Sequence, residues 1–405
     1  MARSSIYVGL EIGTTKVCVV VGEVKGDGAI KLLGVGQAPS RGVRKGEIVD
    51  FDTAQTCLHD ALVRAEDRSD VMIRNIYLSI TGGHVESVNN KGTIRIPDDQ
   101  SEITDGDLEE VKEIAKDVAI PQQNVFLHSI IRHYGVDGQD RVLNPVGMLG
   151  RKLEADYHIV HGIRNRIQNT IRCVREIPLE VEDVVFAPIA SAQVVLGREA
   201  KNQGALMIDV GGGAADYVLY VDGVVAHSGC VAIGGDHITN DISLVYKIPL
   251  SKAERLKVEE GSAKIDADNA AEKIKLDDDT GFGREVERGE LNEVIHFRVR
   301  EMLEQIKKRA SESGNLDRIA GGVYLTGGTS LMKGIEDVAG EVFGMPVHRS
   351  QSAPVSGITA TFDNPQYATP IGLIRYAQIL DSERPPRSAL TRLGRKLSGM
   401  FRGSR

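Results

Sequence analysis

The strongest constraint on the fold is a short unit that occurs twice in the sequence. Each copy is typical of an apolar strand that ends in a carboxylate, a glycine turn and a second apolar strand. Glu11 precedes Gly13 in the first copy, and Asp209 precedes Gly211 in the second, 198 positions later. Because internal repetition indicates a duplicated architecture, we expect two related halves whose glycine turns face each other across a cleft.

The residue types at these turns suit phosphate binding. A backbone that offers its N–H groups to phosphate oxygens must approach them closely, which a Cβ atom hinders. Thr14, Thr15 and Lys16 add hydroxyl donors and a positive charge. Glu11 and Asp209, one from each half, are suited to hold a hydrated Mg²⁺, which takes few protein ligands. These residues are expected to form one site together with Gly13, Gly211, Gly212 and Gly213.

A third glycine turn follows the apolar run 323–326. Gly327, Gly328 and Thr329 precede a helix-like segment that contains Lys333. Because N–H groups at a helix start attract anions, we expect this turn to contact the α-phosphate or the adenosine of a nucleotide. One such unit alone is more often an ordinary hairpin, and it is the repetition that favours a site. The P-loop, G-x-G-x-x-G and G-x-S-x-G motifs are absent.

Length and composition favour a soluble protein with more than one lobe. A chain of 405 residues is longer than a domain with a single hydrophobic core usually is. A composition of 41% hydrophobic and 26% charged residues is typical of globular proteins. The sequence has no run of about 18–20 apolar residues and no secretory h-region at its start, so we expect a cytoplasmic protein. The four cysteines are widely spaced, which favours buried, reduced thiols over a metal cluster.

The end of the chain differs from the rest in charge. Residues 384–405 hold seven basic and no acidic side chains, and subtracting these seven charges from the total of −8 leaves −15 for the remainder. After a stiff, non-helical linker over 381–387, which contains two prolines, five apolar residues recur at helical spacing among basic ones. The stripe and its basic flanks are Leu390, Leu393, Leu397, Met400 and Phe401, with Arg392, Arg395, Lys396 and Arg402.

This pattern predicts an amphipathic helix that lies in the surface of an anionic membrane. Gly394 and Gly399 weaken the helix, so one copy should bind only marginally, whereas linked copies bind firmly through high effective concentration. The alternative to a membrane-binding helix is a disordered basic tail. The tail lacks the aromatic side chains that accompany nucleic-acid binding, and an acidic body also argues against nucleic acid as a partner.

The three turns, in this order, resemble the two phosphate loops and the adenosine loop of the actin/Hsp70/sugar-kinase superfamily. Within it, the chain resembles the FtsA family of bacterial cell-division proteins over nearly its whole length. The segments that carry this resemblance are 9–17, 39–50, 144–150, 209–216 and 367–373. The resemblance implies an α/β fold, namely an actin-like, two-lobed, duplicated ribonuclease-H-type fold with an inserted subdomain 1C.

The resemblance also implies a division into subdomains. Subdomain 1A would comprise 1–81, 162–200 and 364–380, and 82–161 would form the 1C insert. Subdomain 2A would comprise 201–235 and 301–363, and 236–300 would form subdomain 2B. The linker 381–387 and the membrane-targeting helix 388–405 would follow.

Further site residues come from the same resemblance. Glu254 and Lys257 match a Glu-x-x-Lys helix that approaches ribose and adenine, although a solvent-exposed ion pair explains their spacing equally well. Glu11 stands where most of the superfamily has Asp, and Ala214 where a hydroxyl residue is usual. We find no residue to place as the group that orients a water for attack on the γ-phosphate, so the resemblance implies ATP binding with slow or no hydrolysis.

The implied function is that of an ATP- and Mg²⁺-binding protein that forms filaments on the cytoplasmic face of the inner membrane at the division site. It would anchor the FtsZ ring there by binding the C-terminal peptide of FtsZ on subdomain 2B, where Arg298 and Arg300 are the candidates, and subdomain 1C would contact later division proteins. The alternative is a sugar- or acetate-type small-molecule kinase of the same superfamily, which has no use for a basic amphipathic tail. An Hsp70-type chaperone needs a further domain, for which the residues after the linker are too few.

Overall fold

The computed structural model describes residues 5–26, 28–97, 102–276, 284–350, 356–357 and 364–383. The expected membrane-targeting helix, with all of its membrane-binding candidates from Leu390 to Arg402, lies outside these described residues. In the part that is described, no helix combines the length and the apolar character needed to span a bilayer.

The first lobe is built on a six-stranded sheet in the order β11-β6-β1-β2-β3-β19. β1, β2 and β3 form an antiparallel meander, while β6 runs parallel to β1 and β11 parallel to β6. The strands are β1 (Ser5–Ile12), β2 (Lys16–Val24), β3 (Ile30–Pro39), β6 (Asn75–Ile80), β11 (Glu180–Phe186) and β19 (Ser356–Gly357). Helices α1 (Phe51–Ser69) and α3 (Arg164–Arg175) pack beside this sheet, and the short pair β4 (Val43–Arg44) and β5 (Glu47–Ile48) precedes α1.

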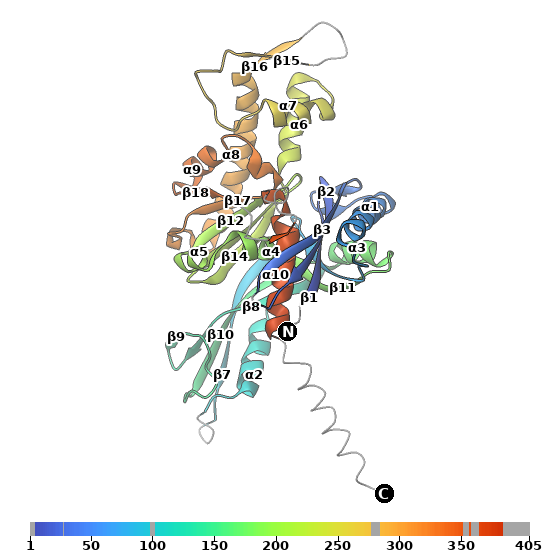
Figure 1. The fold of residues 1–405 in the computed structure, drawn as a ribbon. Coiled ribbons are helices and arrows are strands. Elements are labelled where there is room, and N and C mark those ends of the chain that lie inside the picture. The colour runs from blue at the N-terminus through green and yellow to red at the C-terminus, as the bar shows by residue number, and fades with distance from the viewer. Residues whose placement is uncertain are drawn as a thin grey trace.

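The second lobe is built on a five-stranded sheet in the order β14-β13-β12-β17-β18. Its strands are β12 (Ala205–Val210), β13 (Ala215–Val221), β14 (Val224–Val231), β17 (Val323–Thr326) and β18 (Val347–Arg349). Its helices are α5 (Arg198–Gln203), α6 (Gly235–Tyr246), α7 (Leu250–Glu259), α8 (Arg288–Glu312) and α9 (Ile335–Phe343), with the 3₁₀ turns η1 (Leu316–Arg318) and η2 (Gly328–Leu331). The hairpin of β15 (Lys273–Lys275) and β16 (Glu285–Glu287) extends beyond α6 and α7 at the top of Figure 1.

The two large sheets share one topology, which confirms the predicted duplication. In each, the second strand pairs antiparallel with both the first and the third, and two further strands run parallel beside the first. The sequence repeat marks equivalent places: Glu11 faces Cys18 across the first strand pair, and Asp209 faces Asp216 across the second. The α/β, two-lobed, duplicated fold is therefore as expected.

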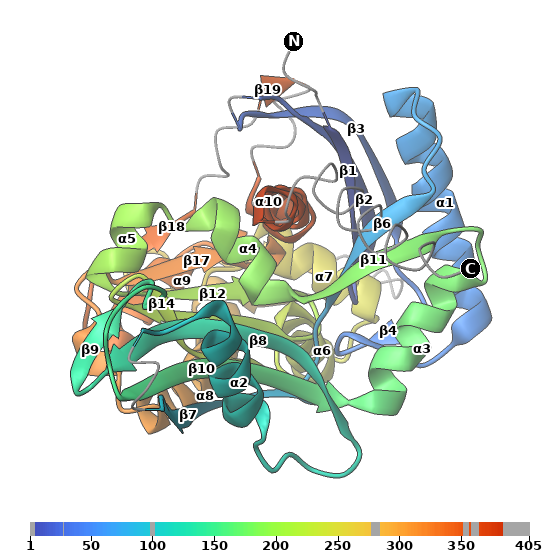
Figure 2. The ribbon, with the colours of Figure 1, turned by 90° about the horizontal axis from the view of Figure 1, so that it is seen from below.

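Two helices join the lobes. α4 (Ala187–Val195) and α10 (Ala368–Glu383), the latter preceded by η3 (Pro365–Tyr367), pack on each other between the two sheets, where Figure 2 shows α10 end-on. A Cβ atom at Gly372 would lie 2.1 Å from the carbonyl oxygen of Ala190, and one at Gly9 would lie 2.3 Å from that of Pro370. Only glycine permits such close approach, so these positions set how tightly the lobes are held together.

A separate four-stranded sheet, in the order β7-β10-β8-β9, projects from the first lobe at the bottom of Figure 1. Its elements are β7 (Val85–Arg95), α2 (Asp105–Lys116), β8 (Asn124–Val136), β9 (Gln139–Val142) and β10 (Lys152–Ile163). Thr104 and Asp107 cap the start of α2 by a reciprocal pair of hydrogen bonds, and the buried face of α2 closes a small core of its own. We call this unit the insert.

The elements differ from the expected subdivision at two places. α8 continues without a break through residue 300, where the sequence placed a boundary between subdomains 2B and 2A. α10 extends to Glu383, so the first three residues of the expected non-helical linker 381–387 are helical. Pro385 disfavours the helical conformation only from the residue before it onward, and the three residues preceding that point are free to complete the last turn of α10.

Candidate functional site

A cavity of about 730 Å³ opens between the lobes, and all three glycine turns line it. The structure brings every residue expected at the phosphate, metal and adenosine positions to this one cavity. They are Glu11, Gly13, Thr14, Thr15, Lys16, Asp209, Gly211, Gly212, Gly213, Glu254, Lys257, Gly327, Gly328, Thr329 and Lys333.

The first two turns are equivalent in conformation and touch each other. Gly13 N–H donates to the Lys16 carbonyl, and Gly211 N–H donates to the Ala214 carbonyl, each at 2.9 Å. A Cβ atom at Gly212 would lie 2.0 Å from Oγ1 of Thr15, and one at Gly213 would lie 2.4 Å from Oγ1 of Thr14. The cradle therefore exists only because these positions lack side chains.

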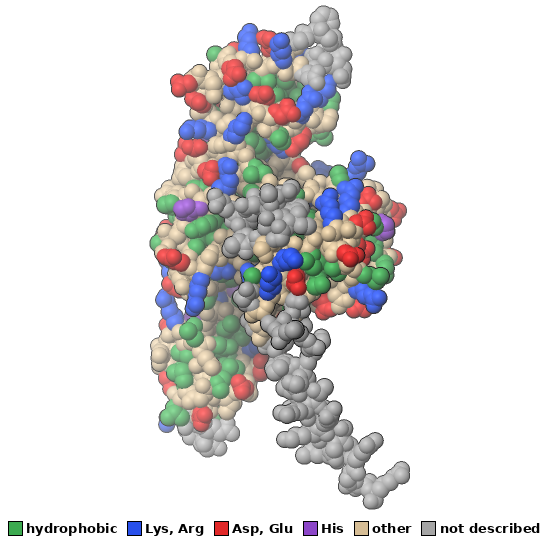
Figure 3. All heavy atoms as spheres, viewed as in Figure 1, with side chains coloured by type: hydrophobic (Ala, Val, Ile, Leu, Met, Phe, Trp, Pro, Cys, Tyr) green, Lys and Arg blue, Asp and Glu red, His purple; other side chains and the backbone are tan. Residues whose placement is uncertain are grey.

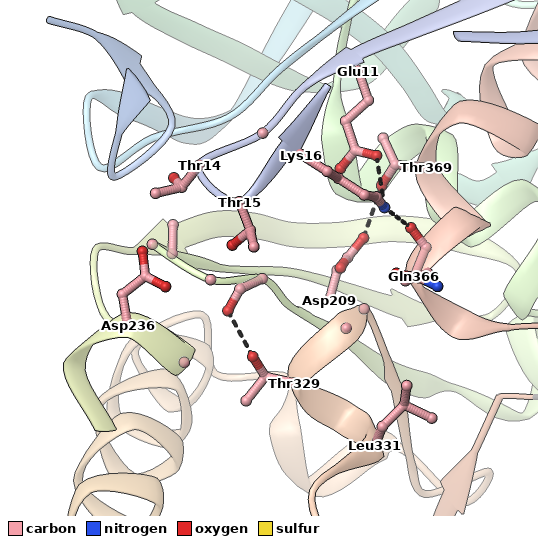
Figure 4. Close-up of a pocket in the computed structure, with 18 of the residues that line it drawn as sticks. Glu11, Thr14, Thr15, Lys16, Asp209, Asp236, Thr329, Leu331, Gln366 and Thr369 are labelled. Carbon is pink, nitrogen blue, oxygen red and sulfur yellow. Dashed lines mark hydrogen bonds and ion pairs between the residues drawn. The ribbon is translucent and has the colours of Figure 1, made fainter. Parts of the chain in front are cut away.

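Two carboxylates and one lysine lie close together in the cavity (Figure 4). Lys16 Nζ is 3.5 Å from Oε2 of Glu11 and also donates to the carbonyl of Gln366. Oδ2 of Asp209 accepts hydrogen bonds from the hydroxyls of Ser191 and Thr369, both at 2.8 Å. Burial raises the pKa of Glu11 and of Asp209, with Lys16 opposing both shifts. Burial alone would lower the pKa of Lys16, but the surrounding acids raise it.

A third acid, Asp216, was not proposed as a site residue from the sequence. It faces Asp209 across the strand pair, and its Oδ2 accepts a 2.5 Å hydrogen bond from Thr81 at the end of β6. Burial raises its pKa to about 7, and the charges of Asp209 and Glu11 add to this rise while the Thr81 bond opposes it. Its position directly opposite Asp209 in the second repeat was the available signal.

These acids fit a divalent cation. Oδ1 of Asp216 is buried and has no hydrogen-bond partner in the described part of the chain, and Oε2 of Glu11 has only its ion pair with Lys16. Buried carboxylates without compensation are costly, and a cation would supply the missing charge. Among the described residues, no three acids, histidines or cysteines are grouped closely enough to hold a metal unaided. Mg²⁺ usually keeps several waters, through which acids that are too far apart to ligate it directly could hold it.

The raised pKa of Asp216 predicts how stability depends on pH. The pKa of Asp216 is about 7 in the folded protein, against an ordinary value of 3.8. Between these two pH values, the folded protein therefore binds more protons than the unfolded chain does. The free energy of unfolding should therefore fall as pH rises through this window, by at most about 4 kcal/mol from this group. We expect Asp216→Asn to be markedly more stable than the wild type at pH 8 without nucleotide, and the advantage to shrink by pH 5. Urea unfolding at several pH values checks this, and an advantage independent of pH would contradict it.

A second part of the cavity wall is a polar cluster formed by α7 and α6. Lys257 is only 7% exposed, and its Nζ donates to Glu254 Oε2 at 2.6 Å, to Thr239 Oγ1 at 2.9 Å and to the Gly235 carbonyl at 3.2 Å. The alternative of a solvent-exposed ion pair is therefore wrong for Lys257. Because three hydrogen bonds use all three donors of its ammonium group, Lys257 positions Glu254 and the start of α6.

The third turn is tied to the second. Thr329 Oγ1 donates to the carbonyl of Gly211 at 3.0 Å, and a Cβ atom at Gly327 would lie 2.4 Å from Oδ1 of Asp209. Gly327 has a φ of 86°, a conformation that favours glycine. Several polar residues of the cavity were not predicted from the sequence, because each is an isolated position that belongs to no recognised motif. They are Ser79, Thr81, Asp236, Gln366 and Thr369.

The two arginines proposed for peptide binding lie on α8, away from the cavity. Arg298 pairs with Asp241 through two contacts of 2.5 and 2.9 Å and also with Glu301. Arg300 pairs with Glu304 at 2.9 Å and with Glu341 at 3.5 Å. Both guanidinium groups thus already have carboxylate partners within the chain. On the face shown in Figure 3, acidic and basic side chains are interspersed over both lobes.

Comparison with known proteins places these observations in a family. The family model described as cell division protein FtsA matches residues 206–372, and that of the SHS2 domain inserted in FtsA matches residues 82–161. The cell division protein FtsA of Pseudomonas aeruginosa is 35% identical, with 98% of each chain covered. That of Borreliella burgdorferi is 34% identical, covering 93% of this chain and 91% of the relative.

Solved structures show the same fold at low identity. A PilM-PilN type IV pilus biogenesis complex aligns with a TM-score of 0.63 at 15% identity, covering 94% of this chain and 99% of the other. MreB5 of Spiroplasma citri bound to AMPPNP aligns with a TM-score of 0.55 at 14% identity, covering 94% and 97%. These structures support the actin-like fold.

Proposed function

The chain belongs to the FtsA family of bacterial cell-division proteins, and we propose that it binds ATP with Mg²⁺ between its lobes and tethers the FtsZ ring to the membrane. The observation that carries the nucleotide proposal is the convergence of the three glycine turns and the acids Glu11, Asp209 and Asp216 on one cavity. The AMPPNP in the MreB5 structure supports a nucleotide as the ligand of an actin-like cavity.

Each part of the cavity has a role in this proposal. The N–H groups of the first two turns and the hydroxyls of Thr14 and Thr15 bind phosphate oxygens, and Lys16 adds positive charge beside them. Glu11, Asp209 and Asp216 would hold Mg²⁺ through its bound waters, and the ion would neutralise phosphate charge. Glu254, held by Lys257, would contact the ribose, and the turn around Gly328 would contact the adenosine.

The proposal predicts a dependence on Mg²⁺ that Asp209 controls. For the wild type, chelating Mg²⁺ with EDTA should weaken ATP binding at least about tenfold, because phosphate charge and the buried acids then repel each other. For Asp209→Asn, we expect EDTA to change the affinity less than about threefold. Isothermal titration calorimetry with ATP measures both. Asp183→Asn is the matched control, since that carboxylate accepts a bond from Tyr376 outside the cavity. Absence of ATP binding to the wild type at saturating Mg²⁺ would sink the proposal.

The tethering part of the proposal combines the role of the family with the basic amphipathic tail of this chain. The family supports a role in cell division with self-association. Filaments would place many basic amphipathic tails on one anionic surface, which turns marginal binding into firm binding. An acidic, apolar peptide from FtsZ would then dock on subdomain 2B. Arg300 is the more accessible of the two proposed arginines, with 41% of its side chain exposed against 28% for Arg298.

The small-molecule kinase remains the competing function for the same cavity. It requires a carboxylate that acts as a base toward a substrate hydroxyl, and Asp216, with a pKa of about 7, is the group that would suit this task. Membership of a cell-division family favours the tether over the kinase. Transfer of the ATP γ-phosphate to sugars or acetate, measured with the purified chain, decides between them.

A further inference from the structure

A loop next to the first phosphate turn reaches the insert. Gly46 N–H donates to Oγ1 of Thr14 at 3.0 Å. Gly46 also lies against the end of β6, since a Cβ atom there would be 2.8 Å from Cγ2 of Thr81. The next residue is Glu47, the first of β5. Glu47 is thus one peptide away from a group that touches the proposed phosphate site.

The carboxylate of Glu47 contacts both connections between the insert and the first lobe. Its Oε1 accepts a 2.5 Å hydrogen bond from Arg166 on α3, the helix that begins directly after β10. The same oxygen is 3.5 Å from Nδ1 of His84, the residue directly before β7. One oxygen atom therefore contacts the chain where it enters the insert and where it leaves it.

His84 is held in an unsatisfied arrangement. Its side chain is 3% exposed, and neither ring nitrogen has a hydrogen-bond partner in the described part of the chain. A hydrogen bond to Glu47 would need the two groups to approach by about 0.5 Å or more. Buried polar groups without partners are rare because they are costly, and a small movement of Glu47 toward His84 would supply the missing bond.

The insert is also fixed to the second lobe. Asn89 Nδ2 on β7 donates to the Ala226 carbonyl on β14 at 2.8 Å, and Ser87 Oγ donates to that of Ser228 at 2.6 Å. The buried ring of His158 bridges Asn89 and Ser228 at 2.7 and 2.8 Å. A shift of one lobe relative to the other must therefore be taken up at the connections near His84 and Arg166.

We propose that Glu47 couples the first phosphate turn to the insert. Occupation of the turn by a triphosphate moves Gly46 through Thr14, and Glu47 then changes its hold on His84 and Arg166. The insert thereby changes its orientation or its order with the state of the cavity. This inference rests on the proposed nucleotide binding and adds a way for that binding to reach a surface remote from the cavity.

Hydrogen exchange of the full chain, with and without ATP and Mg²⁺, tests the coupling. In the wild type, we expect ATP to slow exchange at least about threefold over residues 82–90 and 160–168. In Glu47→Gln, the carboxylate charge is lost, so we expect this difference to fall by half or more while ATP affinity stays within about threefold. Glu176→Gln is the matched control. Its exposed ion pair with Arg172 lies at the C-terminal end of α3, the helix that also carries Arg166, and does not touch the connections of the insert.

The outcomes separate the two proposals. If calorimetry detects no ATP binding, both fail. If ATP binds but exchange over 82–90 and 160–168 is unchanged in the wild type, or if Glu47→Gln keeps the full difference, the coupling alone is wrong. If Glu47→Gln unfolds, His84→Gln is measured in its place. In that variant, an ATP-dependent change in hydrogen exchange over 82–90 as large as in the wild type would also overturn the coupling.

Discussion

Replacing Gly212 by alanine is expected to weaken ATP binding at least about 100-fold, or about 2.7 kcal/mol. The added Cβ would lie 2.0 Å from Oγ1 of Thr15, far inside van der Waals contact. One of the two phosphate turns must then move, and the N–H groups of the two turns can no longer point at the same phosphate group. Isothermal titration calorimetry with ATP and Mg²⁺ measures the loss.

The control for this variant is Gly197→Ala. Nothing lies within 4 Å of a Cβ atom at Gly197, which caps α5 outside the cavity, so its ATP affinity should equal that of the wild type. Thermal unfolding of both variants shows whether the fold is kept. Wild-type affinity in a folded Gly212→Ala variant would contradict the assignment of these turns as a phosphate cradle.

Removal of residues 384–405 is expected to abolish membrane tethering. The cut falls after α10, whose Asp381 accepts a hydrogen bond from Tyr7, so the described lobes keep their contacts. In co-sedimentation with anionic vesicles and ATP, the full chain should pellet and carry a labelled C-terminal FtsZ peptide with it. The shortened chain should leave both in solution, since its apolar stripe and seven basic charges are gone.

Two further measurements give this experiment its controls. Neutral vesicles should bind the full chain at least about tenfold more weakly, because each basic residue near an anionic surface contributes about 1 kcal/mol. Without vesicles, the shortened chain should bind the FtsZ peptide as the full chain does. Equal pelleting of the full and shortened chains would refute the tether.

The local units of the cavity were predictable because they are short and repeated. The strand, carboxylate and glycine pattern around Glu11 and Asp209 predicted two equivalent turns, and the shared 2.9 Å turn hydrogen bonds agree with that. The absence of other nucleotide-binding motifs could likewise be established from the sequence alone. Such features depend on residues close in sequence, whose conformational preferences act directly.

Other parts of the site could not be predicted because they pair residues far apart in sequence. Thr81 and Asp216 form their hydrogen bond across 135 positions, and no local pattern links the two residues. The i, i+3 spacing of Glu254 and Lys257 left an exposed ion pair open, and only the packing of α7 on α6 buries Lys257. Helix periodicity likewise carried no sign that Arg298 would meet Asp241.

What the sequence alone determined is the duplicated acidic glycine turn, with the phosphate chemistry it implies, because turn geometry and side-chain chemistry are local properties. What only the tertiary structure decided is which acids share one cavity, which cations are already neutralised, and how Glu47 touches both connections of the insert. Those depend on contacts between elements far apart in sequence, since burial removes water and lets single charges and hydrogen bonds act across the lobes.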